Sequence, residues 1–509
     1  KEGWEGDQEA IDVFKHDLTN SSANLTFAYA HYENKQQNFM FNELTSHSHA
    51  YAFTEQSVIE GHPCHPGAKL KKGLSPSENY QYSAEFQNSI HLAFIAIHHS
   101  LVSVATLNND WNKMLFSYEP SLKATFQETL IKHNKQTEDY FILPIHPWQM
   151  EKVIPTMYAA ELDKFLLIDV PYNNSAYYAG MSFRTLFPKV IEGLKPHYKL
   201  TTNVHLTGEV RTLSEQTIHN GPLMSEILTS ITKTDLLINE RTFIPIVELG
   251  GLHFLKESDN EPLRTERSEN LACVIRENLY HYIEENEIPI VGSALLSTNT
   301  TNESTLLVQL ICQYKQTYEI DCLKDAVHSF LQKYVQNIIS GVIPLLVKYG
   351  IGLEGHLQNT VPVFHQDGTP TKILIRDWEG IRVDKERLSK AGFDLTKFHA
   401  KSRILTDSLK SVRNKVFYSV VQNHIGELIL QLTKELRDID EQFLWNIVKK
   451  QIDMTFENLQ HNGADVQSIN EDRNIFFNKE IDYKAVTTMR MLGEAHEYSY
   501  VKVSNPLSN

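Results

Sequence analysis

Glu354-Gly355-His356-Leu357-Gln358-Asn359 and, after a short gap, Ile373-Leu374-Ile375-Arg376-Asp377 are the two most informative segments of this chain. Residues 360–364 and 372–375 are apolar runs typical of strands, and the Asp-Gly step between them is a hairpin signal. A hairpin folds back on itself, so Asn359 before its first strand and Asp377 after its second should lie side by side. The two segments therefore predict a polar cluster at one end of a hairpin.

Oxygen ligands at this end of the hairpin suggest a cation site. An amide oxygen beside a carboxylate is a pair of hard ligands of the kind that holds Mg²⁺ against nucleotide phosphates, and protein kinases pair an Asn with an Asp for this purpose. A polar loop beside a hairpin, without chemistry, is the alternative interpretation. The sequence has no Gly-Lys-Ser/Thr, and no Gly-x-Gly-x-x-Gly follows a predicted strand. A bound nucleotide would therefore be held by separate side chains and Mg²⁺.

The bulk properties of the chain limit its organisation and its partners. Its 509 residues are too many for a single core, so two or three domains are expected. A net charge of −15 argues against a nucleic-acid partner or an anionic membrane, unless a local basic groove overrides it. No apolar run is expected to reach the roughly 18 residues of a membrane span, and no signal peptide is recognised.

Cysteine usage favours a reducing, cytoplasmic location. The cysteines are scattered and form no Cys-x-x-Cys pair, which argues against disulfides and against a Cys-rich zinc site. They are Cys64, Cys273, Cys312 and Cys322.

Residues 60–73 predict a rigid, non-helical loop, because they contain two prolines and three glycines. Three lysines close to His62 and His65 would suit a polyanion. A His-x-x-His zinc site is an alternative, but it needs further ligands, and a proline-stiffened surface loop is another. The apolar side chains of residues 83–107 recur at three- and four-residue steps, which predicts a helix.

Later segments predict further strands, some of them with polar faces. Residues 141–145 predict a short buried strand that ends at a His-Pro turn. Residues 197–212 alternate so that, on a continuous strand, Lys199, Thr207 and Arg211 share one face. That face is either exposed or lines a cleft. A second polar strand beside it, with Ser182 and Arg184, favours the cleft, because Arg and Lys clamp carboxylates and phosphates.

The rest of the chain is mainly helical. Residues 1–60 are mostly helical, and a long apolar helix runs from about 323 to a C-cap at Gly350. Two amphipathic helices are expected at about 410–435 and 441–460.

Taken together, the polar segments resemble the siderophore synthetases that act independently of nonribosomal peptide synthetases, the aerobactin-synthetase (IucA/IucC) family. The matching segments keep the family's order and are Gly61-His62-Pro63-Cys64-His65-Pro66 with Lys69, Ser182-Phe183-Arg184-Thr185, Lys199-Leu200 through Thr207 and Arg211, Glu354 to Asn359, Arg376-Asp377, and Asn505-Pro506. The chain departs from the family at Gly355, where alanine is usual, and at Lys71 or Lys72, where arginine is frequent. No motif of the family covers residues 1–60.

This resemblance implies an α+β, multidomain enzyme shaped like a cupped hand. Residues 1–60 would form the thumb. Residues 61–255 would form fingers, built on an antiparallel sheet that binds ATP and substrate. Residues 256–509 would form a largely helical, kinase-like palm with the Mg²⁺ and phosphate site and the C-terminal helices.

The resemblance also implies an ATP-dependent ligase of siderophore biosynthesis. Such an enzyme converts a carboxylate of citrate, or of a related polycarboxylate, into an acyl-adenylate and releases pyrophosphate. An amine, such as that of an amino acid, or a hydroxyl then attacks and gives an amide or ester with release of AMP. ATP and Mg²⁺ are the implied cofactors, a homodimer is the implied assembly, and neither nucleic acid nor membrane is an implied partner.

Residue roles follow from the same resemblance. The residues implied to bind ATP are His65, Lys69, Ser182, Arg184, Thr185, Lys199, Thr207, Gln358 and Asn359. Those implied to bind the carboxylate substrate are Ser182, Thr207, Arg211, His356 and Lys484. Glu354 and Asp377 would hold the metal. The implied catalytic residues are His356, Arg211 and Lys199, and His356 is a candidate acceptor for the proton of the amine.

Two other functions remain open on the residues alone. A small-molecule kinase could use the same Asn/Asp pair, and it would release ADP. A non-catalytic polycarboxylate-binding protein would bind citrate regardless of ATP and Mg²⁺.

Overall fold

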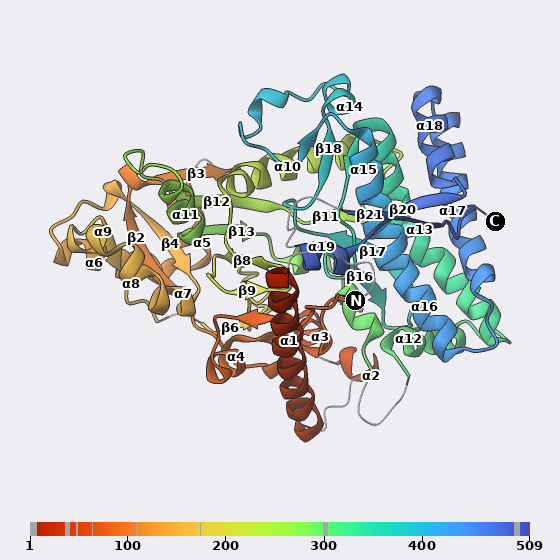
Figure 1. Ribbon diagram of the computed structural model, residues 1–509, viewed down its shortest axis with the longest axis horizontal. Coiled ribbons are helices and arrows are strands. Elements are labelled where there is room, and N and C mark those ends of the chain that lie inside the picture. The colour runs from red at the N-terminus through yellow and green to blue at the C-terminus, as the bar shows by residue number, and fades with distance from the viewer. Residues whose placement is uncertain are drawn as a thin grey trace.

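The computed structural model describes residues 8–35, 41–46, 49–63, 65–107, 110–173, 175–298, 304–492 and 499–508. Helices and sheets are mixed, with about half of the chain helical (Figure 1), so the expected mixture of helix and sheet is confirmed. The cupped-hand shape, the kinase-like palm and the domain boundaries at residues 60 and 255 stay predictions. Strand β13 (Ala272–Arg276) lies beyond the predicted boundary at residue 255, but it pairs with two strands that lie before that boundary.

The N-terminal part is helical, as predicted. It consists of α1 (Gln8–Lys35), α2 (Phe41–Leu44) and α3 (Ala50–Ser57). In Figure 1 the long α1 runs from near the centre of the molecule to its lower edge, and it contacts α19 (Val486–Leu492). The described parts of the loop at residues 60–73 are non-helical, as expected, and lead through β1 (Lys71–Lys72) to α4 (Pro76–Tyr82).

An antiparallel sheet of six strands forms one wall of the site. Its order is β3-β12-β13-β8-β7-β6. The strands are β3 (Val102–Thr106), β12 (Glu248–Phe254), β13 (Ala272–Arg276), β8 (His197–Leu200), β7 (Thr185–Pro188) and β6 (Tyr177–Ala179). Helices α10 (Glu215–Thr234) and α11 (Leu263–Asn270) contact β12.

The prediction of a helix over residues 83–107 is wrong, because the chain there forms strands β2 (Ala93–His98) and β3. Residues 94–97 are buried without a polar break, and a short apolar run of this kind fits a buried strand as well as a helix. Strand β2 is the centre of a three-stranded sheet, between β4 (Tyr140–Ile145) and β5 (Leu167–Asp169). The predicted strand at residues 141–145 is therefore confirmed.

Short helices surround this smaller sheet. They are α5 (Trp111–Tyr118), α6 (Pro120–Lys132), α7 (Pro147–Lys152), α8 (Ile154–Met157) and α9 (Ala159–Asp163). They lie at the left of Figure 1, far from the C-terminal helices.

The predicted hairpin is confirmed. It consists of β16 (Thr360–His365) and β17 (Pro370–Ile375), antiparallel to one another. The hairpin is extended by β11 (Phe243–Pro245), parallel to β17, and by β14 (Glu287–Pro289). The long helix is confirmed as α13 (Leu323–Tyr349), which ends at Gly350 in the left-handed region with φ 64°.

Close packing joins α13 to this sheet. A Cβ atom on Gly341 of α13 would lie 2.2 Å from the ring of Phe243 in β11, so only glycine allows this approach. By length and composition α13 is also apolar enough to cross a membrane. The expectation that no apolar run reaches the length of a membrane span is therefore not met. Most of its apolar window is buried in the fold, and a core helix passes the same test.

Helices of the C-terminal half pack around α13. They are α12 (Leu306–Thr317), α14 (Lys385–Lys390), α15 (Leu409–Val416), α17 (Glu441–His461) and α18 (Val466–Phe476), and α16 (Glu427–Glu435) packs against α12 and α17. The predicted helices at 410–435 and 441–460 are both present. The first contains a π-helical segment, Phe417–Gly426, between α15 and α16.

Short strands complete the described chain. They are β9 (His205–Leu206), β10 (Glu209–Val210), β15 (Ile351–Gly352), β18 (Arg382–Asp384), β19 (Leu405–Thr406), β20 (Glu480–Lys484) and β21 (Tyr500–Ser504). Cys273, Cys312 and Cys322 are free thiols, and Cys64 lies outside the described residues.

Candidate active site

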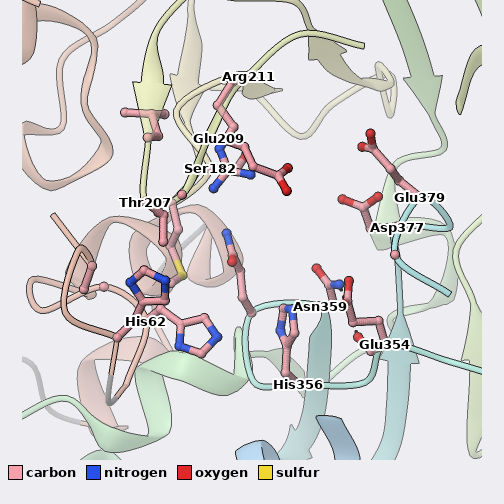
Figure 2. Close-up of a pocket in the computed structure, with 18 of the residues that line it drawn as sticks. His62, Ser182, Thr207, Glu209, Arg211, Glu354, His356, Asn359, Asp377 and Glu379 are labelled. Atoms are coloured by element: carbon pink, nitrogen blue, oxygen red, sulfur yellow. Dashed lines mark hydrogen bonds between the residues drawn. The ribbon is translucent and has the colours of Figure 1, made fainter. Parts of the chain in front are cut away.

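A cleft of about 380 Å³ lies where the six-stranded sheet, the base of the hairpin, the loop after α3 and the C-terminal segment meet. Its size is that of a small-molecule site. Figure 2 shows Asp377 and Glu379 on one side, Arg211 and Thr207 on the other, and His356 between them. The predicted site residues that line it are His65, Ser182, Arg184, Thr185, Lys199, Thr207, Arg211, Glu354, His356, Gln358, Asn359, Asp377 and Lys484.

Lys69 is the predicted site residue that the structure does not bring to the cleft. Its ammonium is buried beside the carboxylate of Glu85, with Nζ 2.7 Å from Oε1. The same carboxylate pairs with Lys71 at 2.6 Å. Contact of Lys69 with ATP would require this buried pair to open, so that role stays a prediction.

The prediction of one continuous strand over residues 197–212 is wrong. Strand β8 ends at Leu200, and β9 and β10 pair with each other, so the chain reverses after Leu206. Thr207 makes the turn with φ 60°, a conformation that non-glycine residues rarely adopt. Thr207 and Arg211 still reach the same cleft as Lys199, but because of this reversal and not because of strand alternation.

Opposite charges meet at the centre of the cleft. The ammonium of Lys199 lies 2.8 Å from Oδ1 of Asp377 and 2.9 Å from Oε2 of Glu379. Arg184 also approaches Glu379, with Nη2 3.3 Å from Oε2. Burial alone would raise the pKa of Asp377, but the charges of Lys199 and Arg276 outweigh it and hold that pKa well below its usual range. Asp377 is therefore ionised at neutral pH.

Asn359 and Asp377 lie at adjacent positions, as predicted. The N–H of Arg376 donates to the carbonyl of Asn359 at 3.0 Å, which continues the hairpin ladder by one step. The side-chain Nδ2 of Asn359 donates to the carbonyl of Glu354 at 3.2 Å. The amide oxygen of Asn359 is therefore left to accept or to coordinate, on a residue that lines the cleft.

These oxygen atoms fit a magnesium ion. Glu354, Asp377 and Asn359 line one cleft, and Mg²⁺ in nucleotide sites takes one or two carboxylates and completes its shell with phosphate and water. Among the residues that the structure describes, no group of three or more His, Cys, Asp or Glu forms a self-sufficient metal site. Glu354 is oriented by Lys415, with Nζ 2.7 Å from Oε1.

Three imidazoles line the floor of the cleft. The ring of His62 lies 5.7 Å from that of His356 and 5.8 Å from that of His65, measured between centroids. Burial lowers the pKa of His356 to about 4 and that of His65 to about 3, so both rings are neutral at pH 7. Nδ1 of His356 is buried and has no hydrogen-bond partner among the described residues.

A buried histidine, His424, contacts the backbone of the loop that carries His356. Nδ1 of His424, in the π-helical segment, lies 3.0 Å from the carbonyl of Gly355, and its Nε2 lies 2.7 Å from the hydroxyl of Tyr334. A neutral ring satisfies both contacts when Nδ1 donates and Nε2 accepts. A Cβ on Gly355 would lie 2.9 Å from Cγ2 of Val420, so glycine suits this position better than the alanine usual in the family.

Several cleft residues were not among the predicted site residues. Glu379 follows Asp377 by two positions, so proximity was a usable signal. His62 belongs to a motif that was recognised, but no role was given to it. The other additions carried no local signal, and they include Met181, Glu209, Gln216, Arg382, Arg403, Met489 and Arg490.

Comparison with known proteins decides the family. Residues 50–297 match the model described as the IucA / IucC family, and residues 328–499 match one described as ferric iron reductase FhuF-like transporter. A D-ornithine–citrate ligase of Staphylococcus aureus is 42% identical over 508 residues, which cover 98% of this chain and 77% of that protein. The chain belongs to the IucA/IucC family. The resemblance inferred from scattered motifs is therefore confirmed.

Solved structures share the fold of this IucA/IucC family member. The petrobactin biosynthesis protein AsbB of Bacillus anthracis aligns with a TM-score of 0.84 at 24% identity, over 99% of this chain and 80% of that one. ATP-bound aerobactin synthetase IucA of Klebsiella pneumoniae aligns with a TM-score of 0.79 at 17% identity, over 98% and 84%. At these identities the likeness establishes the fold.

Proposed function

We propose that the protein is an ATP-dependent ligase that adenylates a carboxylate of citrate, or of a related polycarboxylate, and joins it to an amine or hydroxyl. The observation that carries the proposal is the single cleft in which Lys199 and Arg184 face Asp377 beside Asn359. The relative that is 42% identical is named a citrate ligase, and a structure of the same fold is ATP-bound. Both support the proposal.

The charge distribution suits two polyanionic substrates. The chain carries a net charge of −15, so cations must be concentrated locally to attract citrate and ATP. The cations that line the cleft are Arg184, Lys199, Arg211, Arg382, Arg403, Lys484 and Arg490. Arg211 suits a carboxylate in particular, because its planar fork donates two parallel hydrogen bonds.

ATP would lie between the turn after β6 and the base of the hairpin. Ser182, Thr185 and Thr207 offer hydroxyl groups there, and Gln358 offers an amide. Glu354, Asp377 and Asn359 would hold Mg²⁺, which supplies charge neutralisation for the pyrophosphate when bound. His65 lines the same cleft.

In the first step a carboxylate oxygen of the substrate attacks the α-phosphorus. A P–O bond to the carboxylate forms, the bond between the α- and β-phosphates breaks, and pyrophosphate leaves. The carboxylate is already a nucleophile, so no base is needed. Lys199 and Arg184 act by neutralising charge in place, and the cleft acts by alignment.

In the second step the amine nitrogen attacks the acyl carbon. A C–N bond forms, the C–O bond to AMP breaks, and the nitrogen must lose a proton. His356 is the proposed acceptor, because its ring is neutral and its buried Nδ1 has no partner among the described residues.

The test separates this reaction from its alternatives. Purified protein is incubated with ATP, Mg²⁺, citrate and a panel of amines, and nucleotide products are resolved by chromatography. AMP and pyrophosphate in a citrate-dependent reaction support the ligase, whereas ADP would indicate a kinase. Citrate binding that is unchanged when ATP and Mg²⁺ are omitted, with no turnover for any amine, would indicate a binding protein.

We also propose a cytoplasmic location and a homodimer. The free thiols of Cys273, Cys312 and Cys322 support a reducing compartment. Analytical ultracentrifugation of the purified protein tests the dimer, and a single monomeric species at micromolar concentration would contradict it.

A further inference from the structure

Helix α3 precedes the motifs recognised in the sequence, although it lies within residues 50–297 that match the family model, and one of its side chains reaches both walls of the cleft. Glu55 is 1% exposed. Its Oε2 accepts the backbone N–H of Met181 at 2.9 Å, in the turn after β6. Its Oε1 accepts from Nη2 of Arg376 at 2.5 Å, at the base of the hairpin. One carboxylate thus connects two segments that are distant in sequence.

The first of these segments is the turn that carries Ser182 and Arg184. It is closed by the N–H of Gly180, which donates to the carbonyl of Thr185 at 2.8 Å, and by the hydroxyl of Ser182, which donates to that of Thr185 at 2.9 Å. Phe183 has φ 67°, so the turn is held in a conformation that is costly for a non-glycine residue. The contact from Glu55 to Met181 ties this turn to α3.

The second segment is the base of the hairpin. Nη2 of Arg376 also donates to the carbonyl of Gln358 at 2.8 Å, and Nη1 donates to the hydroxyl of Tyr51 in α3. The next residue, Asp377, has φ 77°, so its carboxylate is placed by a backbone conformation that the neighbours must enforce. Tyr51 in turn donates to Oε1 of Glu55 at 3.0 Å, which closes the network.

We propose that Glu55 is a positioning residue for the reaction, because it sets the separation between the turn that carries Ser182 and Arg184 and the hairpin base that carries Gln358 and Asp377. This inference rests on the proposed function. It also gives the N-terminal helices a role: α3 forms the bridge between the two walls of the cleft. Glu55 does not line the cleft, so its effect on the reaction is indirect.

The expected consequence of losing the bridge is a loss of turnover rather than of binding. ATP is held by many groups, so the loss of one indirect support should change its affinity by less than about threefold. In-line attack depends on alignment, and a displacement of about 1 Å can cost on the order of a hundredfold in rate. Glu55→Gln keeps the size of the side chain and an acceptor for Met181, but it removes the charge that holds Arg376.

The experiment compares Glu55→Gln with Asp472→Asn. Asp472 is also buried and ionic, with its Oδ2 2.6 Å from Nη1 of Arg387, but it lies among the C-terminal helices and does not line the cleft. Both variants lose a buried, ion-paired carboxylate, and Asp472 also pairs with Arg413 at 2.6 Å, so both should lose thermal stability, Asp472→Asn at least as much. Only Glu55→Gln is expected to lower kcat for citrate-dependent pyrophosphate release by tenfold or more, with the dissociation constant for ATP nearly unchanged.

Hydrogen exchange gives a readout that does not require the reaction. Glu55→Gln should accelerate exchange in the peptides that contain residues 180–185 and 354–359, relative to Asp472→Asn at equal folded fraction. If wild-type protein releases no pyrophosphate with any substrate, the proposed function fails, but the exchange data still test the bridge.

Two results overturn the inference. One is a kcat for Glu55→Gln within twofold of that of Asp472→Asn, and the other is unchanged exchange in both peptides. If Glu55→Gln does not fold, Glu55→Asp replaces it, because a carboxylate shortened by one methylene keeps its charge but cannot reach both Met181 and Arg376. The same criteria then apply.

Discussion

Lys199 and Asp377 form an ion pair across the cleft, with 2.8 Å between Nζ and Oδ1. Lys199 lies in β8 of the six-stranded sheet, and Asp377 follows β17 of the sheet that contains the hairpin. The pair therefore joins two separate sheets at the point where the phosphates of ATP are proposed to bind. Glu379 shares the same lysine at 2.9 Å, so the loss of either carboxylate leaves Lys199 with a partner.

Asp377→Asn is expected to lower kcat/KM for citrate-dependent pyrophosphate release by about a hundredfold. The substitution removes a charge-assisted contact to the metal and another to Lys199, and one such contact contributes roughly 1.5–3 kcal/mol. Thermal stability should change little, since Glu379 still pairs with Lys199. Initial rates over a range of Mg²⁺ concentrations provide the measurement. The control is Asp482→Asn, whose carboxylate pairs with Lys502 outside the cleft. Near-normal turnover of Asp377→Asn at limiting Mg²⁺ would show that the metal assignment is wrong.

Arg211→Lys is expected to lower kcat/KM for the carboxylate substrate by about tenfold to a hundredfold, because lysine keeps the charge but replaces a bidentate fork with a point contact. Arg211 lines the cleft and is partly buried, and this burial lowers its pKa from the ordinary value, as does the charge of Arg184. ATP affinity, measured by calorimetry, should be nearly unchanged. A kinetically silent Arg211→Lys would move the carboxylate site elsewhere in the cleft.

His424 should make stability depend on pH between pH 6.5 and pH 4. Burial lowers its pKa from 6.5 to about 4, so the unfolded chain binds more protons than the folded one in this window. The stability due to the neutral ring is fully present above pH 6.5 and is lost as the pH falls toward 4, by about 2 kcal/mol between pH 7 and pH 5. His424→Gln should reduce this dependence in urea unfolding at the two pH values. The matched control is His461→Gln, at an exposed position. If the free energy of unfolding depends on pH equally in the two variants, His424 is not the group responsible.

Asp17→Asn should loosen the C-terminal wall of the cleft. The buried carboxylate of Asp17 in α1 lies 2.5 Å from Nη2 of Arg490 in α19, and it also pairs with Lys72. Without that charge, trypsin should cleave sooner within residues 484–492, and KM for citrate should rise severalfold because Lys484 and Arg490 line the cleft. The control is Asp12→Asn, an exposed position on the same helix. If proteolysis is equally fast in both variants, Asp17 does not anchor α19.

The sequence was sufficient for elements whose signals are local. The hairpin was predictable because Asp-Gly lies between two apolar runs, and the end of α13 was predictable because Gly350 can adopt a positive φ. The helix predicted over residues 83–107 failed for an equally physical reason. A run of apolar residues that is buried on all sides has no polar face from which its period can be read.

By itself the sequence determined the family, and every site residue predicted from it except Lys69 lines the cleft, because polar motifs in a given order are a property of the chain alone. The tertiary structure decided how they meet. Thr207 and Arg211 join Lys199 through a reversal at a positive φ, Lys69 turns away to Glu85, and Glu55 connects the two walls. These relationships depend on contacts between segments far apart in sequence, and no local pattern of residues records which buried charge will find which partner.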